Sequence, residues 1–273
     1  MRNKLSLFIL LISALTAYRG PAAASTSLVP DEFPSIQAAV DEAGPGDIVL
    51  VGEGVYEENV RIDKALTLKS TGRPEKTTIV AADKAAPALS VTGAAGFEVS
   101  GFTLTGSSTA GLAVRGSRDG RVTGLRAVGN YSGILIYDSS NNAIEGNSGD
   151  SNEFYGIYLE RSHDNRVERN TASRNRDRGI FLTYSHGNSI VDNDVNLNTW
   201  NGITLWESDD NVVRDNLTLR NTYGIVIGHS YGNVVEGNTS LPNVYIILPA
   251  LLLYLGIITY LVERSILRRI YGK

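Results

Sequence analysis

The sequence GIYLERSHDNRVERN at residues 156–170 is followed by a second copy of the same pattern, GIFLTYSHGNSIVDN, at residues 179–193. Six such copies begin at glycines spaced 22 or 23 residues apart, which are Gly111, Gly133, Gly156, Gly179, Gly202 and Gly224. Within each copy, apolar and polar residues alternate, as they do in a β-strand with one buried face. A unit of this length cannot bury its apolar face alone, so the copies must stack on one another.

Serine and asparagine recur at fixed positions of this repeat. Serine stands six residues after each glycine, and asparagine stands nine, fourteen and nineteen residues after it in most copies. The three asparagine positions hold 16 of the 21 asparagines of the chain, which are Asn142, Asn165, Asn188, Asn211 and Asn233; Asn147, Asn170, Asn193, Asn216 and Asn238; and Asn130, Asn152, Asn175, Asn198, Asn221 and Asn243. Stacked amides form ladders, bonding to the backbone of their own turn and to the next amide. We therefore interpret these columns as structural.

The repeat predicts an all-β fold, a right-handed parallel β-helix over residues 46–243 with about 8–9 rungs of 22–23 residues. Each rung is expected to hold about three short strands and to pair with the next rung at about 4.8 Å. Residues 34–43 have helical spacing, with Ser35 as the N-cap, inside an N-terminal segment at residues 25–45. This helix is predicted to cap the N-terminal end of the β-helix, which would otherwise expose apolar rung edges.

The two ends of the chain carry targeting signals. Residues 1–24 have the basic start, apolar run and small residues of a signal peptide, with an uncleaved anchor as the alternative. Residues 244–262 form an uncharged run that spans roughly 28 Å as a helix, which predicts one transmembrane helix. The basic tail at residues 263–273 marks the cytoplasmic side. We expect a single-pass protein of the cell membrane with an extracytoplasmic β-helix; the alternative for residues 244–262 is a buried core helix.

Composition excludes several classes of function. The chain has no cysteine, which excludes disulfides, a thiol nucleophile and cysteine-held zinc or iron–sulfur sites. Between residues 20 and 262 it carries 18 basic and 28 acidic residues, so no nucleic acid partner is expected. Because the glycine, serine and asparagine columns recur in nearly every copy, a functional site must be built from residues that break the repeat.

Aromatic residues break the repeat along one side of the middle rungs. They occupy outward positions after the glycines and the turn that leads into each of these strands. Rings along an elongated face suit the apolar C–H patches of sugars, and charged groups beside them bind hydroxyls. The predicted polysaccharide-binding residues are Tyr137, Tyr155, Tyr158, Arg178, Phe181, Trp200 and Trp206. The alternative is an aromatic ladder covered by loops or by a partner protein.

Three carboxylates at nearly matching positions on different rungs are the candidates for catalysis: Asp138, Glu160 and Glu207. A glycosidase needs two carboxylates about 5–10 Å apart, which surface residues of neighbouring rungs also provide by chance. No catalytic residue is therefore assigned, and a binding protein is favoured over an enzyme. An enzyme of this sequence is expected to be a polysaccharide lyase or a glycoside hydrolase.

Two histidines share one column of the repeat. His163 and His186 each stand seven residues after their glycine, which places their Cα atoms ~5 Å apart on neighbouring rungs. Such a pair suits copper or zinc, but two ligands without a third make an incomplete site. Hydrogen-bonded turn histidines are the alternative. No metal or other cofactor is therefore predicted, with copper and calcium as the ions to test.

The sequence also resembles a known group of proteins. FPSIQAAVDEAGPGD at residues 33–47 and VGEGVYEENV at residues 51–60 resemble the opening of pectin-lyase-like β-helix proteins. The repeats are similar to the carbohydrate-binding and sugar-hydrolase (CASH) group, and most of all to NosD-type proteins, whose namesake is a periplasmic accessory protein for nitrous oxide reductase maturation. The resemblance covers roughly residues 33–243 and implies the fold, since its motifs specify coils and turns rather than chemistry.

Three functions are thus expected from the sequence. The first is a membrane-anchored, extracytoplasmic protein that binds cell-surface polysaccharide or a partner protein. The second, implied by the resemblance, is an accessory factor of a membrane complex that handles a metal or a cofactor precursor. The third is a polysaccharide lyase or hydrolase.

Overall fold

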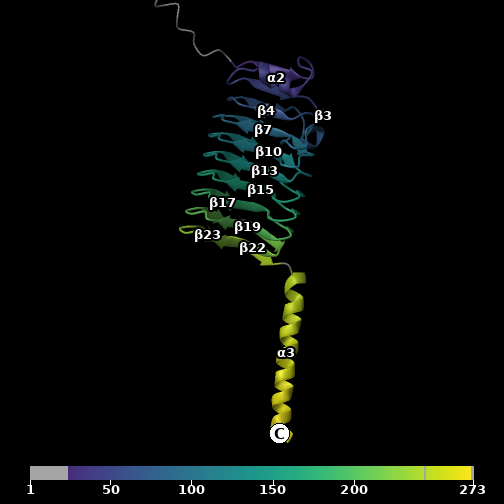
Figure 1. The fold of residues 1–273 in the computed structure, drawn as a ribbon, viewed down its shortest axis with the longest axis vertical. Helices are drawn as coiled ribbons and strands as arrows, with labels where there is room; N and C mark the ends of the chain where they lie inside the picture. The colour runs from purple at the N-terminus through teal and green to yellow at the C-terminus, as the bar shows by residue number, and fades with distance from the viewer. Residues whose placement is uncertain (1–23, 243, 272–273) are drawn as a thin grey trace, which may run out of the picture.

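The computed structural model describes residues 24–242 and 244–271. It shows a parallel β-solenoid of the right-handed type with about nine turns, followed by one long helix (Figure 1). This confirms the predicted β-helix. The predicted signal peptide lies outside the described residues except for Ala24, and Asn243 of the third asparagine column lies outside them as well.

Parallel strands cover three faces of the solenoid. The first sheet contains β1 (Thr26–Val29), β2 (Ile48–Val51), β5 (Thr67–Ser70), β8 (Glu98–Ser100), β11 (Arg121–Thr123), β14 (Ala143–Glu145), β16 (Arg166–Glu168), β18 (Ser189–Val191), β20 (Val212–Arg214) and β23 (Val234–Glu236). The second sheet contains β4 (Val60–Ile62), β7 (Leu89–Thr92), β10 (Ala110–Arg115), β13 (Ser132–Tyr137), β15 (Ile157–Glu160), β17 (Ile180–Thr183), β19 (Asn201–Trp206) and β22 (Tyr223–Gly228). The third face contains β3 (Gly54–Glu57), β6 (Thr77–Val80), β9 (Thr103–Thr105), β12 (Arg126–Ala127), β21 (Leu217–Asn221) and β24 (Thr239–Pro242), with a short 3-10 helix, η1 (Pro74–Lys76), before β6.

The repeat sets the register of these sheets. Ile134 pairs with Ile157, which pairs with Ile180, so equivalent residues of successive copies lie side by side. The apolar residues one and three positions after each glycine are fully buried in the middle turns, as Ile157 and Leu159 show. The core is thus a column of stacked aliphatic side chains, each repeated one turn further along the axis.

The third face differs from the prediction of three strands in every rung. Between β12 and β21 it contains only isolated bridges, at Ser148, Thr171 and Asp194. Four residues separate Asn170 from Asn175, and Arg174 adopts a left-handed conformation with φ of 59°. The same spacing and a left-handed Arg220 accompany β21 between Asn216 and Asn221, so the distance between the corners does not by itself exclude a strand.

The asparagine columns form the expected ladders inside the solenoid. Nδ2 of Asn142 donates to Oδ1 of Asn165 at 3.0 Å, and the same bond continues through Asn188 and Asn211 to Asn233. Each Oδ1 also accepts the main-chain N–H of the preceding ladder asparagine, at 2.9 Å for the bond from Asn142 to Asn165. These buried amides are consequently bonded both to backbone and to each other, and the columns are structural as predicted.

A left-handed residue precedes most ladder side chains. Asp164 before Asn165, Arg161 before Ser162 and Leu197 before Asn198 have φ of 55°, 46° and 60°. For an L-residue, this left-handed conformation costs roughly 1–2 kcal/mol. The ladder bonds offset that cost at each corner, because the buried amide or hydroxyl would otherwise lose its partners.

The two ends of the solenoid differ. Helix α2 (Ile36–Glu42) covers the N-terminal end, with the Ser35 hydroxyl accepting the N–H of Ala38 at 3.2 Å, as predicted for this cap. Strand β1, which is not predicted from the sequence, pairs with β2. At the other end the last strands are followed by α3 (Val244–Tyr271), which extends away from the solenoid in Figure 1.

Helix α3 contains the segment for which a membrane span is predicted. Its described side chains between Leu251 and Ile266 are exposed, most of them apolar. Within residues 24–242 and 244–271, however, no helix combines the length and the apolar character that crossing a membrane requires. The predicted span at residues 244–262 is therefore not supported.

Candidate functional site

The site lies at the corner that leads from the third face into the second sheet. Here the turn column, which we define as Tyr131, Phe154, Asp177 and Trp200, occupies one equivalent position in four successive turns. Each member after Tyr131 donates its main-chain N–H to the carbonyl of the member before it, at 2.7 Å for Phe154, 3.1 Å for Asp177 and 3.0 Å for Trp200. The backbone therefore holds these four side chains one above another along the solenoid axis.

Rings from the turn column and the second sheet form one continuous cluster. Tyr131 and Phe154 stack at 4.8 Å between centroids, and Phe154 meets the edge of Tyr155 at 5.2 Å. Tyr155 in turn contacts Tyr158 and Phe181, which stack on each other at 5.2 Å because β15 and β17 pair in register. The result is an aromatic face that turns the corner of the solenoid.

An arginine–aspartate pair is set into this cluster. The Arg178 guanidinium lies 4.6 Å from the centroid of Phe181 and 5.9 Å from that of Tyr155, and its Nη1 donates to Oδ2 of Asp177 at 2.8 Å. Burial raises the pKa of the Asp177 carboxyl above its ordinary value, and the charge of Arg178 opposes this rise. The pair therefore places both an acceptor and a donor among aromatic rings.

Burial also raises the pKa of two tyrosines. The pKa of Tyr158 is raised first by burial and then by the charge of Glu160, to which its hydroxyl donates at 3.1 Å. Burial raises the pKa of Tyr155 in the same way, followed by the charge of Asp177. Both phenols stay neutral at physiological pH and act as hydrogen-bond donors or as apolar surface.

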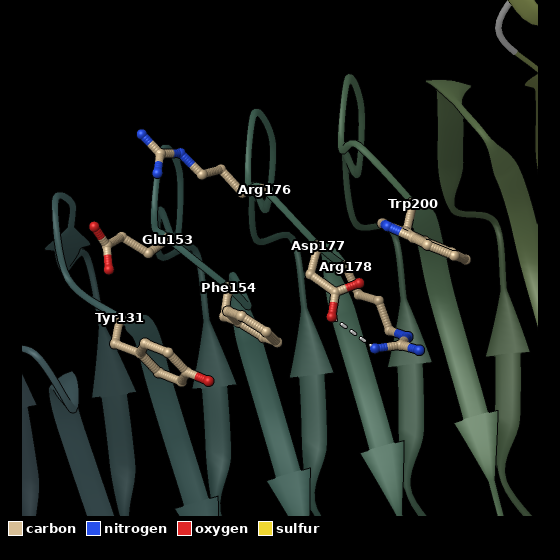
Figure 2. A pocket seen from close by; sticks show the side chains of 7 residues that line it. All are labelled: Tyr131, Glu153, Phe154, Arg176, Asp177, Arg178 and Trp200. Atoms are coloured by element: carbon tan, nitrogen blue, oxygen red, sulfur yellow. Dashed lines mark hydrogen bonds and ion pairs between the residues drawn. The ribbon is translucent and has the colours of Figure 1, made fainter.

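A cavity of about 530 Å³ opens at the turn column. Figure 2 shows Asp177 between Phe154 and Trp200, with Arg178 below it. The residues that line the cavity are Tyr131, Glu153, Phe154, Arg176, Asp177, Arg178 and Trp200. Its volume lies within the range of ligand sites, and its lining of rings with a few charged groups is typical of them.

Two buried polar atoms, on residues that directly follow turn-column residues in the sequence, have no hydrogen-bond partner. They are Nε of Arg178 and Oδ1 of Asn201, and the third such atom within the described residues is Oγ of Ser100. Arg178 and Asn201 occupy neighbouring turns, each directly before the glycine of its repeat. Buried polar groups of native proteins are nearly always bonded, so these two atoms are exceptions within the described structure.

The predicted binding residues fall into three places. Tyr155, Tyr158, Phe181 and Arg178 lie together in the aromatic cluster, and Trp200 lines the cavity. Tyr137 lies apart, with the guanidinium of Arg161 4.4 Å from its ring centroid. Trp206 lies at the far end of β19, where its ring contacts His229 edge-on at 4.6 Å.

The set predicted from the sequence omits five of the seven residues that line the cavity. These are Tyr131, Glu153, Phe154, Arg176 and Asp177. The signal for most of them is positional: Tyr131, Phe154 and Asp177 stand two residues before the glycine of their repeat, as Trp200 does. Comparing that single position across the copies identifies the column together with its one acidic member.

The three catalytic candidates each have a neighbouring side-chain partner. Asp138 pairs with Arg161 at 2.7 Å, and Glu160 accepts the hydroxyl of Tyr158. The charge of Glu207 raises the pKa of Tyr184, which lies on the preceding turn. A catalytic role for Asp138, Glu160 or Glu207 stays a prediction.

The two histidines stack as predicted, at 5.2 Å between ring centroids and 6° between planes. Nδ1 of His163 accepts the main-chain N–H of His186 at 3.2 Å, and Nδ1 of His186 accepts that of Asp209 at 2.9 Å. Because both Nδ1 atoms accept main-chain N–H groups, the pair offers a metal only its two Nε2 atoms, which make an incomplete site.

Metal ligands are also scarce elsewhere in the described part of the chain. There, no group of three or more histidine, cysteine, aspartate or glutamate side chains is placed to hold a metal ion. Copper prefers imidazole, thiolate and thioether ligands. With no cysteine, one methionine and three histidines in the sequence, the described residues do not fit a copper site.

Comparisons with known proteins agree with the fold. Residues 46–247 match the model of a family described as periplasmic copper-binding protein (NosD). A cell surface glycoprotein of Methanothermus fervidus is 34% identical over 70 residues, which cover 25% of this chain and 12% of that protein. The chain therefore spans only a small part of that curated relative.

Two solved structures show the same architecture. The PL6 family alginate lyase AlyGC has a TM-score of 0.59 at 17% identity, over 80% of this chain and 35% of that one. Pectate lyase Pel9A has a TM-score of 0.52 at 14% identity, over 76% of this chain and 68% of that one. At these identities the likeness shows a shared parallel β-helix and no more.

Proposed function

We propose that this chain, which belongs to the NosD family, is an extracytoplasmic binding protein that holds cell-surface polysaccharide on its aromatic face. The observation that carries the proposal is the cavity at the turn column, where exposed rings surround the Asp177–Arg178 pair. Sugars present apolar C–H patches and a rim of hydroxyls, so they need both ring faces and paired donors and acceptors. The cavity offers this combination.

The location of the site supports a long ligand. Strands β13, β15, β17 and β19 lie side by side, and the rings of the turn column together with Tyr155, Tyr158 and Phe181 extend over four successive turns. A chain of sugars lying along the axis can contact a new turn about every 4.8 Å. The family description and the cell surface glycoprotein relative support a place outside the cytoplasm for such an encounter.

The test is a glycan array probed with the purified full chain and two variants. Phe154→Ala and Trp200→Ala remove the rings on either side of Asp177, and we expect each to lower the affinity for any bound glycan at least tenfold. Tyr231→Ala is the matched control, because Tyr231 is 78% exposed and lies outside the cavity. Absence of glycan binding by the folded chain, or equal affinity in all variants, contradicts the proposal.

A second candidate is an accessory factor that binds a protein of a membrane complex, which family membership favours. Copper handling by the described residues is not part of this candidate, because their donors do not fit a copper site. The same aromatic face is then the docking surface. Recovery of one partner protein by crosslinking in native envelopes, lost in Trp200→Ala, together with a silent glycan array, would favour this candidate.

Attachment to the envelope through residues 244–262 is a separate part of the proposal. The apolar side chains of α3 have no cover from the solenoid in the described structure, and such surfaces mark interaction sites. We expect the chain to stay with membranes after alkaline extraction and a version that ends at Pro242 to be released. Release of the complete chain under these conditions contradicts an anchor.

A further inference from the structure

The turn column is interrupted at one place. Tyr131, Phe154 and Trp200 carry rings, and the turn between Phe154 and Trp200 carries Asp177 instead. Successive turns are about 4.8 Å apart, so the backbone positions that carry Phe154 and Trp200 are separated by two turns, or roughly 10 Å. The cavity opens at this position, where the shorter Asp177 side chain lies between Phe154 and Trp200 (Figure 2).

The width of the gap suits one inserted ring. Carbon atoms in contact lie about 3.5–4.0 Å apart, so a ring held between two aromatic faces needs roughly 7–8 Å between them. Tyr131 stacks on the other side of Phe154 and fixes that wall. Trp200 is 55% exposed and is free to close the remaining space by a side-chain rotation.

The floor of the gap is polar but carries no net charge. Asp177 and Arg178 pair at 2.8 Å, and Arg178 Nε has no partner. Glu153 and Arg176 at the rim add one charge of each sign. The four charged groups balance, so the site has no excess of positive charge with which to select an acidic ligand.

We propose that the gap takes up a single neutral, all-equatorial hexopyranose unit, held between Phe154 and Trp200; this rests on the proposed polysaccharide binding. An all-equatorial sugar has only axial C–H groups on both faces, which contact aromatic rings well. Its hydroxyls lie around the edge, where the Asp177 carboxylate and the Arg178 guanidinium offer an acceptor and a donor. An axial hydroxyl would be pressed against one ring and lose its hydrogen bonds.

The test compares two sugars that differ at one stereocentre. The probes are β-1,4-linked glucose and mannose tetrasaccharides, which share their linkage and differ only in the orientation of the 2-hydroxyl. Binding to the full chain, kept in a non-carbohydrate detergent, is measured by titration calorimetry. We expect mannotetraose to bind at least tenfold more weakly than cellotetraose, because burying an unpaired hydroxyl is costly. Tetragalacturonate, which is acidic, is expected to bind no better than mannotetraose.

A variant that fills the gap separates the site from the rest of the face. Asp177→Phe completes the turn column with a residue that its neighbours already accept, and we expect it to abolish cellotetraose binding while the unfolding temperature stays within a few degrees. Tyr231→Ala serves as the control that leaves binding unchanged. The variant Asp177→Asn, which keeps the gap open, is expected to retain binding at reduced affinity.

The outcomes distinguish the two proposals. Equal binding of glucose and mannose tetrasaccharides, preferential binding of tetragalacturonate, or full binding by Asp177→Phe overturns the gap as an all-equatorial sugar site and leaves polysaccharide binding standing. No binding of any oligosaccharide or polysaccharide by the folded chain overturns both.

Discussion

The asparagine ladders and the turn column are built by the same stacking and differ in one respect. In the ladder from Asn142 to Asn233 the same side chain occupies every turn, and each amide bonds to the next. In the turn column the side chain changes from tyrosine to phenylalanine to aspartate to tryptophan. A repeated residue in a solenoid gives each turn the same support, whereas a varied column creates one place unlike all others. Repetition therefore marks structure, and its interruption marks the candidate site.

The largest effect on stability is expected when one ladder amide is removed. Asn170 makes bonds to Ile144, Asn147 and Asn193, between 2.8 and 3.0 Å. Asn170→Ala leaves several buried groups unpaired, so we expect the free energy of unfolding to fall by about 3–5 kcal/mol. Urea denaturation followed by circular dichroism measures this. A loss no larger than that of Trp200→Ala would show that the ladders do not carry the fold.

A second change tests the closeness of the turns. A Cβ added at Gly156 would lie 2.6 Å from the carbonyl oxygen of Gly149 and 2.7 Å from that of Gly179. Neither backbone atom can move freely, so Gly156→Ala is expected to cost about 2–3 kcal/mol of unfolding free energy. Thermal and urea denaturation provide the measurement. Gly256→Ala in α3, where a Cβ meets nothing within 4 Å, is the control and should not lower stability.

Trp200→Ala tests whether the turn column serves binding rather than stability. Trp200 is more than half exposed, so we expect the unfolding free energy to change by less than about 1 kcal/mol. Binding of glycan should nevertheless fall at least tenfold, as measured by calorimetry. Combined loss of stability and binding would mean that the turn column is part of the scaffold.

The Asp177 carboxyl gives a smaller, pH-dependent effect. Burial raises its pKa in the folded chain above the ordinary value of 3.8. The folded state then binds this proton more tightly, so its contribution to stability is present at acid pH and is lost as pH rises from about 3.8 through the raised pKa. We expect the difference in unfolding free energy between the unsubstituted chain and Asp177→Asn to decrease over that window. Parallel stability profiles of the two proteins contradict this.

The smallest effect is expected at Asp138. Its pair with Arg161 is about half exposed on both sides, and exposed pairs of this kind contribute little. Asp138→Asn should change the unfolding free energy by about 0.5 kcal/mol or less and leave glycan affinity as it is. Loss of product release from a polysaccharide in this variant would instead identify Asp138 as catalytic.

The sequence alone predicts the scaffold well because each local rule is repeated six times. The glycines, serines and asparagines identify the strands, the corners and the in-register stacking that the structure confirms. The prediction fails for features that are not repeated in every turn. Strand β1 has no copy to align with, and the pattern of the third face does not distinguish the turns that form strands from those that form only isolated bridges.

The candidate site is harder to read from the sequence for a related reason. Asp177 looks like any polar turn residue until its neighbours one turn before and after are seen to be rings. The unpaired Nε of Arg178 and the balance of charges at the rim depend on side-chain packing that periodicity does not describe. Clustering of Tyr155, Tyr158 and Phe181, in contrast, follows directly from the register.

The ladders also give the turns of the solenoid a regular spacing along its axis. Because each turn contacts its neighbours through the same set of bonds, a whole 23-residue unit can be duplicated or deleted without disturbing the register of the rest. Each unit added after Trp200 would move the cavity about 4.8 Å further from the start of α3. The number of turns thus sets the height at which a ligand is held, independently of the residues that hold it.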